Sequence, residues 1–353
     1  MDKKEAILAK INALNNLLQE DGLDGMIITD CTDRYYLLCE HIAPKEAVLL
    51  VYKKGLVCVT RKLFLDSLNR DYPYVQFVGQ DHEQEQRVLE VIASLGLKKV
   101  GFDAGKEEYA VGKLFKAAGC VEAKSYLSQL REVKDEREIE LMRESGRIAY
   151  NAYEHIKSFF REGVTELEVV AELERYMRVN GASGTAFDTI VGFGEETGDV
   201  HSMPGNRKLK WNEAVTLDFG CIYNGYCSDM TRSWWFGDKE PEEYKKIWAL
   251  VNEAWQAGLA AEKPGMTGQE MDSLARKIIT DGGYGEYFTH RLGHGIGMVV
   301  HEEPCNDQNN TKPLQKGNVV TVEPGIYLPG KFGVRLEETT VVTDTGAEIL
   351  TRK

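Results

Sequence analysis

The first part of the chain alternates short apolar runs with amphipathic stretches. The apolar runs have the length of buried strands, and the stretches between them place apolar residues three or four positions apart. The predicted strands are 25–28, 47–51, 56–60, 75–78 and 99–102, and the predicted helices are 62–69, 83–94 and 107–118. Because strands alternate with helices, we predict a compact α/β domain here.

A mostly charged run at positions 131–138 separates this pattern from the next one. It opens a long stretch in which Ile148, Ala152, Ile156 and Phe159 recur at helical spacing. A chain of 353 residues is long enough for two domains that each bury a core. We therefore predict an N-terminal α/β domain at residues 1–130 and a second domain at residues 131–353.

The second domain contains an internal repeat. With an offset of 102 residues, the first copy consists of Ala152, Tyr153, Gly163, Thr165 and Glu168, and the second of Ala254, Trp255, Gly265, Thr267 and Glu270. Each copy predicts a helix, a Gly-x-Thr turn and a second helix that begins with a capping box. We expect two similar halves with a site between them, where ligands from both halves would converge.

A hairpin in the second domain brings two aspartates together. Aromatic and β-branched residues flank Asn224-Gly225, the strongest short-range hairpin signal. A two-residue turn there pairs Asp218 with Thr231, so Asp229 is the diagonal neighbour of Asp218 on the same face, with Cα atoms roughly 7 to 8 Å apart. Two such carboxylates repel each other unless a cation lies between them.

Three further candidate ligands come from separate segments. His294 lies among alternate glycines, which let backbone approach a site closely. Glu323 follows a short apolar strand that Pro324 and Gly325 end, and strand spacing puts Arg335 and Glu337 on one face. Carboxylates with one imidazole favour Mn, Fe, Co or Zn over the metals of thiolate sites.

Six motifs occur in a diagnostic order. They are Asp-Phe-Gly at 218–220, Ser-Asp-Met-Thr-Arg at 228–232, His-Arg-Leu-Gly-His-Gly-Ile-Gly at 290–297, Val-His-Glu-Glu-Pro at 300–304, Val-Glu-Pro-Gly-Ile-Tyr at 322–327 and Gly-Val-Arg-Leu-Glu at 333–337. This order resembles the metallopeptidases with the creatinase or pita-bread fold, over roughly residues 130 to 353. Within them it is most similar to the proline peptidases, Xaa-Pro aminopeptidase and Xaa-Pro dipeptidase (prolidase).

The resemblance implies an α/β N-terminal domain and an α+β pita-bread catalytic domain with internal pseudo-twofold symmetry. It implies that the site binds two divalent cations. Mn is the expected metal, and Co or Zn would be tolerated. Asp229 and Glu337 would bridge both cations, Asp218 would bind one, and His294 and Glu323 the other.

The resemblance also implies roles for residues around the cations. His201, His290 and His301 would line the substrate cleft, and Arg335 would support the site. In the expected reaction, Glu323 accepts a proton from water and passes it to the leaving nitrogen, while His301 or His201 stabilises the oxyanion. The substrates would be small proline-containing peptides cut before proline, and the N-terminal domain would narrow the cleft and contribute to a homodimer.

One segment departs from the family pattern. Proline peptidases usually carry an Asn and a Leu-Pro ahead of the first cleft histidine, whereas this chain has Gly-Glu-Glu-Thr-Gly-Asp-Val at 194–200 before His201. The histidine is retained on a more acidic loop. This difference bears on substrate preference more than on the chemistry.

The composition of the chain limits the protein's possible binding partners and its location in the cell. A net charge of −13 argues against nucleic acid, since phosphate binding needs clustered Lys and Arg. No stretch reaches the roughly 18 apolar residues of a membrane span, and no basic segment precedes an apolar run at the start.

The seven cysteines lack any CxxC spacing and are expected to be reduced thiols, with Cys221 and Cys227 pointing away from the metals. We expect a cytoplasmic enzyme without membrane association.

Two other functions stay open at this point. A methionine aminopeptidase shares the catalytic fold but usually lacks a large N-terminal domain. A metal-free creatinase-like hydrolase, or a peptide-binding relative, would have lost ligands, whereas all five are present here. Substrate length also stays open, because a dipeptidase must recognise a free carboxylate beyond the proline and an aminopeptidase must leave that end open.

Overall fold

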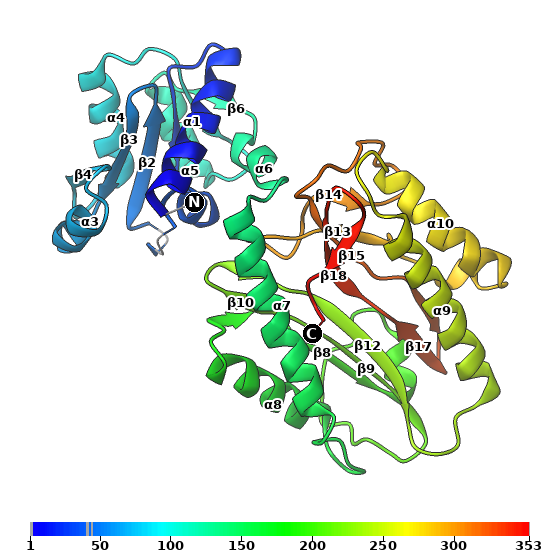
Figure 1. The fold of residues 1–353 in the computed structure, drawn as a ribbon. Coiled ribbons are helices and arrows are strands. Elements are labelled where there is room, and N and C mark those ends of the chain that lie inside the picture. Colours follow the sequence, from blue (N-terminus) through cyan, green and yellow to red (C-terminus); the bar gives the residue numbers. More distant parts are fainter. Residues whose placement is uncertain (1–2, 40–41, 44, 353) are drawn as a thin grey trace. The chain divides into compact units, whose positions relative to one another are not determined.

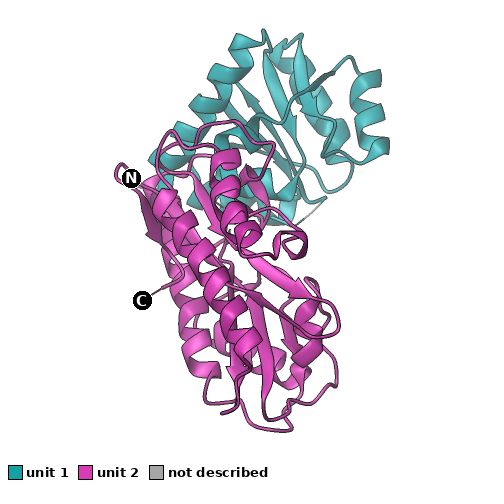
Figure 2. Ribbon diagram, turned by 90° about the vertical axis from the view of Figure 1, so that its right-hand side faces the viewer, with its two compact units in different colours: residues 1–131 teal, residues 132–353 magenta. Residues whose placement is uncertain are grey.

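A computed structural model describes residues 3–39, 42–43 and 45–352 of the chain. The chain divides into two compact units, residues 1–131 and 132–353, which Figure 2 distinguishes by colour. None of the helices formed by the described residues has the length and apolar character that crossing a bilayer requires.

Unit 1 is built on a six-stranded sheet with the strand order β4-β3-β2-β1-β5-β6. The strands are β1 (Gly25–Ile28), β2 (Ala47–Tyr52), β3 (Gly55–Thr60), β4 (Gln76–Gly79), β5 (Val100–Asp103) and β6 (Val121–Ala123). β1 pairs antiparallel with β2 and parallel with β5. The five strands predicted from the sequence are confirmed to within one residue at each end.

The helices of unit 1 are α1 (Lys3–Glu20), α2 (Cys31–Leu38), η1 (Lys62–Phe64), α3 (Leu65–Asp71), α4 (Gln84–Leu95), α5 (Tyr109–Ala117) and α6 (Tyr126–Arg131). Four elements were not predicted from the sequence, namely α1, α2, α6 and β6. In α1, Ile7, Ile11, Leu14 and Leu18 are buried at helical spacing, so the pattern was present in the chain.

Unit 2 has two halves, each with a helix pair beside a sheet (Figure 1). The first half contains α7 (Glu136–Ile156), α8 (Glu166–Val179), β7 (Gly184–Thr185), β8 (Ile190–Phe193), η2 (Gly194–Gly198), β9 (Glu213–Phe219), β10 (Cys221–Tyr223), β11 (Tyr226–Cys227) and β12 (Met230–Phe236). Its sheets have the orders β12-β9-β8 and β11-β10-β7. α7 ends before Phe159, which still packs against the apolar core of this half.

The second half contains α9 (Glu242–Ala261), α10 (Gly268–Asp281), η3 (Gly285–Tyr287), β13 (Gly293–Gly295), β14 (Glu302–Asn306), β15 (Val319–Val322), β16 (Gly325–Leu328), β17 (Phe332–Arg335), β18 (Glu338–Val342) and β19 (Ala347–Ile349). Its sheets have the orders β14-β13-β15-β18-β19 and β16-β17. A second apolar core lies around α9 and α10.

The internal repeat is visible in the hydrogen bonds of the two halves. Thr165 and Thr267 both form complete capping boxes, at the starts of α8 and α10. The preceding glycines, Gly163 and Gly265, have φ of 87° and 92°, and their N–H groups donate to Leu209 O and Leu314 O respectively. The predicted pseudo-twofold symmetry of the catalytic unit is confirmed.

The predicted hairpin has the expected register. Asp218 on β9 lies opposite Thr231 on β12, and Tyr223 lies opposite Tyr226 across the turn. Asn224 and Gly225 have φ of 45° and 83°, as a two-residue type I′ turn requires. Local turn chemistry therefore sets the relative position of the two aspartates.

Candidate metal centre and substrate pocket

The five predicted ligands all line one pocket of unit 2, with a volume of about 290 Å³. Asp218 is on β9, Asp229 directly precedes β12, His294 is on β13, Glu323 follows β15, and Glu337 lies between β17 and β18. The strands of both halves thus contribute to the site. The other lining residues are Phe187, Asp188, Ile190, Val200, His201, Met203, Val300, His301 and Arg335.

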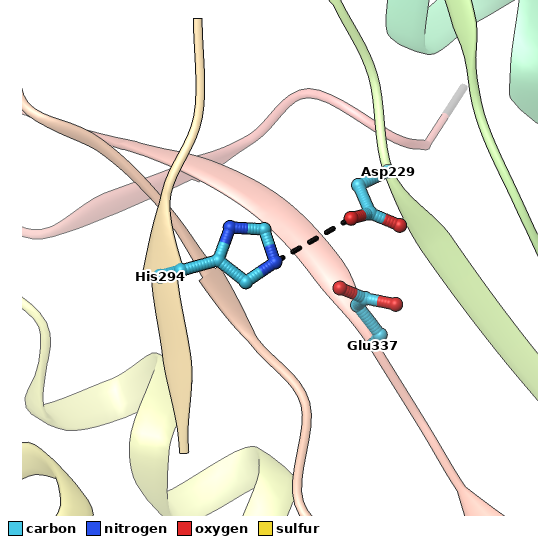
Figure 3. Close-up of side chains that lie close together, drawn as sticks. All are labelled: Asp229, His294 and Glu337. Carbon is cyan, nitrogen blue, oxygen red and sulfur yellow. Dashed lines mark ion pairs between the residues drawn. The ribbon is translucent and has the colours of Figure 1, made fainter. Parts of the chain in front are cut away.

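Asp229, His294 and Glu337 form the centre of the site (Figure 3), with one possible ligand atom of each lying within 4.8 Å of the others. His294 Nε2 is 3.6 Å from Asp229 Oδ2 and 3.4 Å from Glu323 Oε1. His294 Nδ1 donates to Gly295 O at 3.0 Å, so the Nε2 lone pair faces the carboxylates. This is the orientation that an imidazole ligand needs.

Close backbone packing sets the position of His294. A Cβ atom at Gly293 would lie 1.9 Å from Thr321 O, so only glycine fits there. The backbone N–H of His294 donates to Thr321 Oγ1 at 3.0 Å. The glycine-rich sequence predicted such a close approach, and the structure contains it.

Arg335 organises the opposite side of the site. Its Nη2 donates to Asp218 Oδ2 at 2.6 Å, and its Nε donates to Thr231 Oγ1 at 3.0 Å. Thr231 Oγ1 in turn donates to Glu337 Oε2 at 2.6 Å. One guanidinium therefore orients two of the acidic side chains, one of them through a threonine.

Three buried threonines support the ligands, and none of them was predicted from the sequence to be a site residue. Thr231 bonds Glu337, Thr321 donates to Glu323 Oε1 at 3.2 Å, and Thr339 donates to the Asp229 carbonyl at 2.8 Å. Each threonine lies two positions from a ligand, at 229/231, 321/323 and 337/339. Because side chains alternate along strands, this spacing was a usable signal.

The three candidate cleft histidines have different environments. His201 and His301 are exposed at the pocket, and the His301 ring centroid is 4.4 Å from that of His294. His290 does not line the pocket. Its Nδ1 donates to Arg291 O at 2.7 Å, and its Nε2 accepts from Tyr327 at 2.8 Å, while Arg335 Nη1 donates to the Tyr327 hydroxyl. His290 thus contacts the site through Tyr327, a residue that the sequence analysis did not name.

The pKa values of the site residues are shifted because the acidic side chains are buried and lie close together. Burial, and then the nearby Glu337, raise the pKa of Asp229 well above its usual value. Burial, and then Glu323, do the same to the pKa of Glu337, and burial raises the pKa of Glu323 to about 7. Burial lowers the pKa of His294 to about 3, so this imidazole is neutral. Neutral imidazole and clustered carboxyl groups are what a divalent cation binds after displacing protons.

The carboxylate oxygens leave room for a cation. Within the described parts of the chain, Asp218 Oδ1 and Asp229 Oδ1 are buried and have no hydrogen-bond partner. Such orphaned acceptors are costly unless something else binds them. The donor set of carboxylates and one imidazole therefore fits a divalent metal. Neither Cys221 nor Cys227 lines the pocket.

Comparisons with known proteins agree with this site. Residues 140–344 match metallopeptidase family M24, and residues 10–133 match the creatinase/prolidase N-terminal domain. An uncharacterized peptidase of Staphylococcus aureus is 44% identical over 349 residues, covering 98% of this chain and 99% of the relative.

Two solved structures show the same architecture. An Xaa-Pro dipeptidase from Bacillus anthracis superposes with a TM-score of 0.94 at 36% identity, covering 98% of each chain. An X-Pro aminopeptidase from Thermotoga maritima superposes with a TM-score of 0.87 at 32% identity, covering 94% of this chain and 96% of that one. The chain therefore belongs to metallopeptidase family M24 and has its pita-bread catalytic fold.

Proposed function

We propose that this protein is an Xaa-Pro dipeptidase that hydrolyses the bond before proline with the help of two divalent cations. The main support is the buried group of Asp218, Asp229, His294, Glu323 and Glu337 in one pocket. All five ligands are present, which counts against a metal-free relative. The match of residues 10–133 to the creatinase/prolidase N-terminal domain counts against a methionine aminopeptidase.

The residues around the site have defined tasks in this reaction. When bound, the cations would supply a Lewis acid for the scissile carbonyl and a lowered pKa for water. Glu323 is the base that accepts a proton from the attacking water and passes it to the leaving nitrogen. His301, whose pKa is lowered chiefly by burial, is neutral near pH 7 and donates one N–H to the developing oxyanion. His201 lies at the same pocket and is the second candidate for this hydrogen bond.

One arginine supports a preference for dipeptides. Among the described residues no carboxylate pairs with Arg291, and its Nη1 donates to the thiol of Cys305 at 3.2 Å. Burial raises the pKa of that thiol, so it stays neutral. Arg291 is close enough to the pocket that its charge, after burial, contributes to lowering the pKa of His301. A half-buried guanidinium without an anion there suits the free carboxylate of an Xaa-Pro dipeptide.

Matched peptides test this assignment. Chelator-stripped protein should cleave an Xaa-Pro dipeptide only after Mn²⁺ is added, and should cleave the corresponding tripeptide and Xaa-Pro amide far more slowly. Equal cleavage of the tripeptide would mean an aminopeptidase instead. Mn²⁺ is our choice for the native metal because the ligand shell is rich in oxygen. The homodimer expected from the resemblance and the cytoplasmic location expected from the composition stay predictions.

A further inference from the structure

The stretch 288–292 leads into the metal centre without regular secondary structure of its own. It connects η3 to β13, and His294 follows two residues after Leu292. Phe288 and Leu292 are buried, with 3% and 0% of their surfaces exposed. The buried backbone polar groups of such a stretch need hydrogen-bond partners from other parts of the chain.

Two side chains of α10 are partners for three of these backbone groups. Arg276 Nη1 donates to Phe288 O at 2.9 Å, and Arg276 Nη2 donates to His290 O at 2.7 Å. Asp272 Oδ2 accepts the backbone N–H of Leu292 at 2.9 Å. The stretch is thus bonded to α10 at its first, middle and last residues.

The backbone of the stretch has few other partners. In the described parts of the chain, its first N–H donates to Gly285 O at 3.3 Å, and the carbonyl of Arg291 accepts from the ring of the residue before it. The Leu292 carbonyl accepts the N–H of Glu323 at 2.8 Å. The first two bonds are local, so the backbone of the stretch is bonded to distant segments only through α10 and Glu323.

The two α10 side chains also bind each other. Arg276 Nε donates to Asp272 Oδ1 at 2.7 Å, and Nη2 donates to Oδ2 at 2.9 Å. Asp272 is fully buried, and the Arg276 side chain is 22% exposed. A bidentate pair of this kind holds the planar guanidinium in one orientation, so its remaining N–H groups point in fixed directions.

The corresponding helix of the first half lacks this pair. At the offset of 102 residues, Val170 and Glu174 on α8 take the places of Asp272 and Arg276. Both helices begin with a capping box and pack into the core of their own half. The pair is therefore not required to form the helix, and it accompanies the stretch that leads to the metal ligands.

Leu292 connects the pair to a metal ligand. Its N–H bonds Asp272, and its carbonyl bonds the backbone N–H of Glu323. Glu323 Oε1 lies 3.4 Å from His294 Nε2. A shift of Leu292 would therefore move the Glu323 backbone relative to His294.

We propose that Asp272 and Arg276 are positioning residues that hold Leu292, and through it Glu323, and so set the affinity for the one cation that His294 and Glu323 bind. The assignment of that cation rests on the proposed function, whereas the attachment of the stretch to α10 does not.

The other cation should be little affected by the pair. Its ligand Asp218 bonds Arg335, and the bridging ligands Asp229 and Glu337 bond threonines on β18 and β12 respectively. None of these contacts involves α10. Loss of the pair should therefore weaken one of the two metal sites, by the 10- to 100-fold that is typical for residues behind metal ligands.

Titration of chelator-stripped, full-length protein with Mn²⁺ tests this, with free Mn²⁺ measured by electron paramagnetic resonance. The wild type should show two tight sites. Arg276→Lys keeps the charge but not the planar fork, so one site should keep its affinity and the other should weaken by about 10- to 100-fold. The control Arg175→Lys makes the same change in a bidentate pair with Glu172 on α8, outside the pocket, and should bind like the wild type.

Hydrogen exchange of the metal-free protein tests the attachment of the stretch without any cation. Peptides covering 288–293 should exchange faster in Arg276→Lys than in the wild type, whereas peptides covering 268–281 in α10 should not. Asp272→Asn removes the charge that binds Arg276 and should act in the same direction. It is the second variant in case the first one does not fold.

Equal Mn²⁺ binding by Arg276→Lys and the wild type, or an equal weakening of both sites, would overturn the proposal. Hydrolysis of an Xaa-Pro dipeptide by Arg276→Lys should recover at saturating Mn²⁺, and a lasting loss would show that the pair only supports the fold. A wild type that leaves the dipeptide uncleaved would refute the proposed function instead. Exchange of 288–293 would still decide whether the pair holds the stretch.

Discussion

Arg335 Nη2 donates to Asp218 Oδ2 at 2.6 Å, and both side chains are buried. The same guanidinium donates to Thr231 and to Tyr327, so it ties together β9, β12, β16 and the acidic centre. Its positive charge, followed by that of Arg291, partly offsets the raised pKa of Glu323. Arg335 is therefore a buried cation in direct contact with the group of four acidic ligands.

Arg335→Met should destabilise the metal-free protein by about 3–5 kcal/mol, because it leaves Asp218 buried without its partner. Urea unfolding in the presence of a chelator measures this. The control Arg147→Met removes an exposed arginine that is paired with Glu144, and should cost at most about 1 kcal/mol. Equal losses of unfolding free energy in the two variants would show that the buried pair of Arg335 and Asp218 stabilises the fold no more than an exposed pair does.

His301→Ala should leave the metal content unchanged and lower kcat by about 100-fold, as the loss of an oxyanion donor does. Metal analysis and steady-state kinetics on the same preparation are needed. His155→Ala, a change outside the pocket, is the control for general effects. A loss of bound metal in His301→Ala would mean that this histidine has been assigned the wrong role.

Arg291→Met should raise KM for an Xaa-Pro dipeptide by about 10- to 100-fold, the value of one charge-assisted hydrogen bond. The Xaa-Pro amide lacks the carboxylate, so its hydrolysis should change little. Arg291→Lys should recover part of the binding because it keeps the charge. If dipeptide and amide are affected alike, Arg291 supports the fold of the β13–β14 region and does not bind substrate.

Glu262, which is far from the metal ligands in the sequence, should make the free energy of unfolding depend on pH. This side chain is fully buried, Thr340 Oγ1 donates to its Oε2 at 2.7 Å, and burial raises its pKa to about 8. A raised carboxyl pKa stabilises the fold at low pH, and that stability is lost as pH rises from 4.5 through about 8.

Glu262→Gln should remove this dependence. Between pH 5.5 and 8.5 the wild type should lose about 3 kcal/mol more of its unfolding free energy than the variant. Chelated protein is used for both, and the exposed Glu253→Gln on α9 serves as control. Parallel pH curves for wild type and Glu262→Gln would show that Glu262 is already ionised in the fold.

The parts of the site that follow from local chemistry could be predicted from the sequence. Asn224 and Gly225 determine the hairpin register, and the register determines the partner of Asp218. The strand ends at Glu323 and the glycines around His294 are likewise local features. For the same reason the capping boxes at Thr165 and Thr267 were predictable.

Contacts between distant segments could not be predicted this way. Tyr327 separates His290 from the pocket, and nothing near His290 in the sequence indicates that contact. Glu166 was not predicted to have any role, because its bonds to Phe193 and Gly205 form once the chain has folded. Thr231 likewise bonds Glu337 across a separation of 106 residues.

The measurement that tests the account most directly is hydrolysis of an Xaa-Pro dipeptide by metal-stripped and Mn²⁺-reconstituted protein, for the wild type and Asp229→Ala. We predict that the wild type binds two Mn²⁺ per chain and regains activity. Asp229→Ala should lose bound metal and all hydrolysis, because Asp229 lies at the centre of the acidic cluster. Turnover by Asp229→Ala, or by the stripped wild type without added metal, would contradict the two-metal assignment.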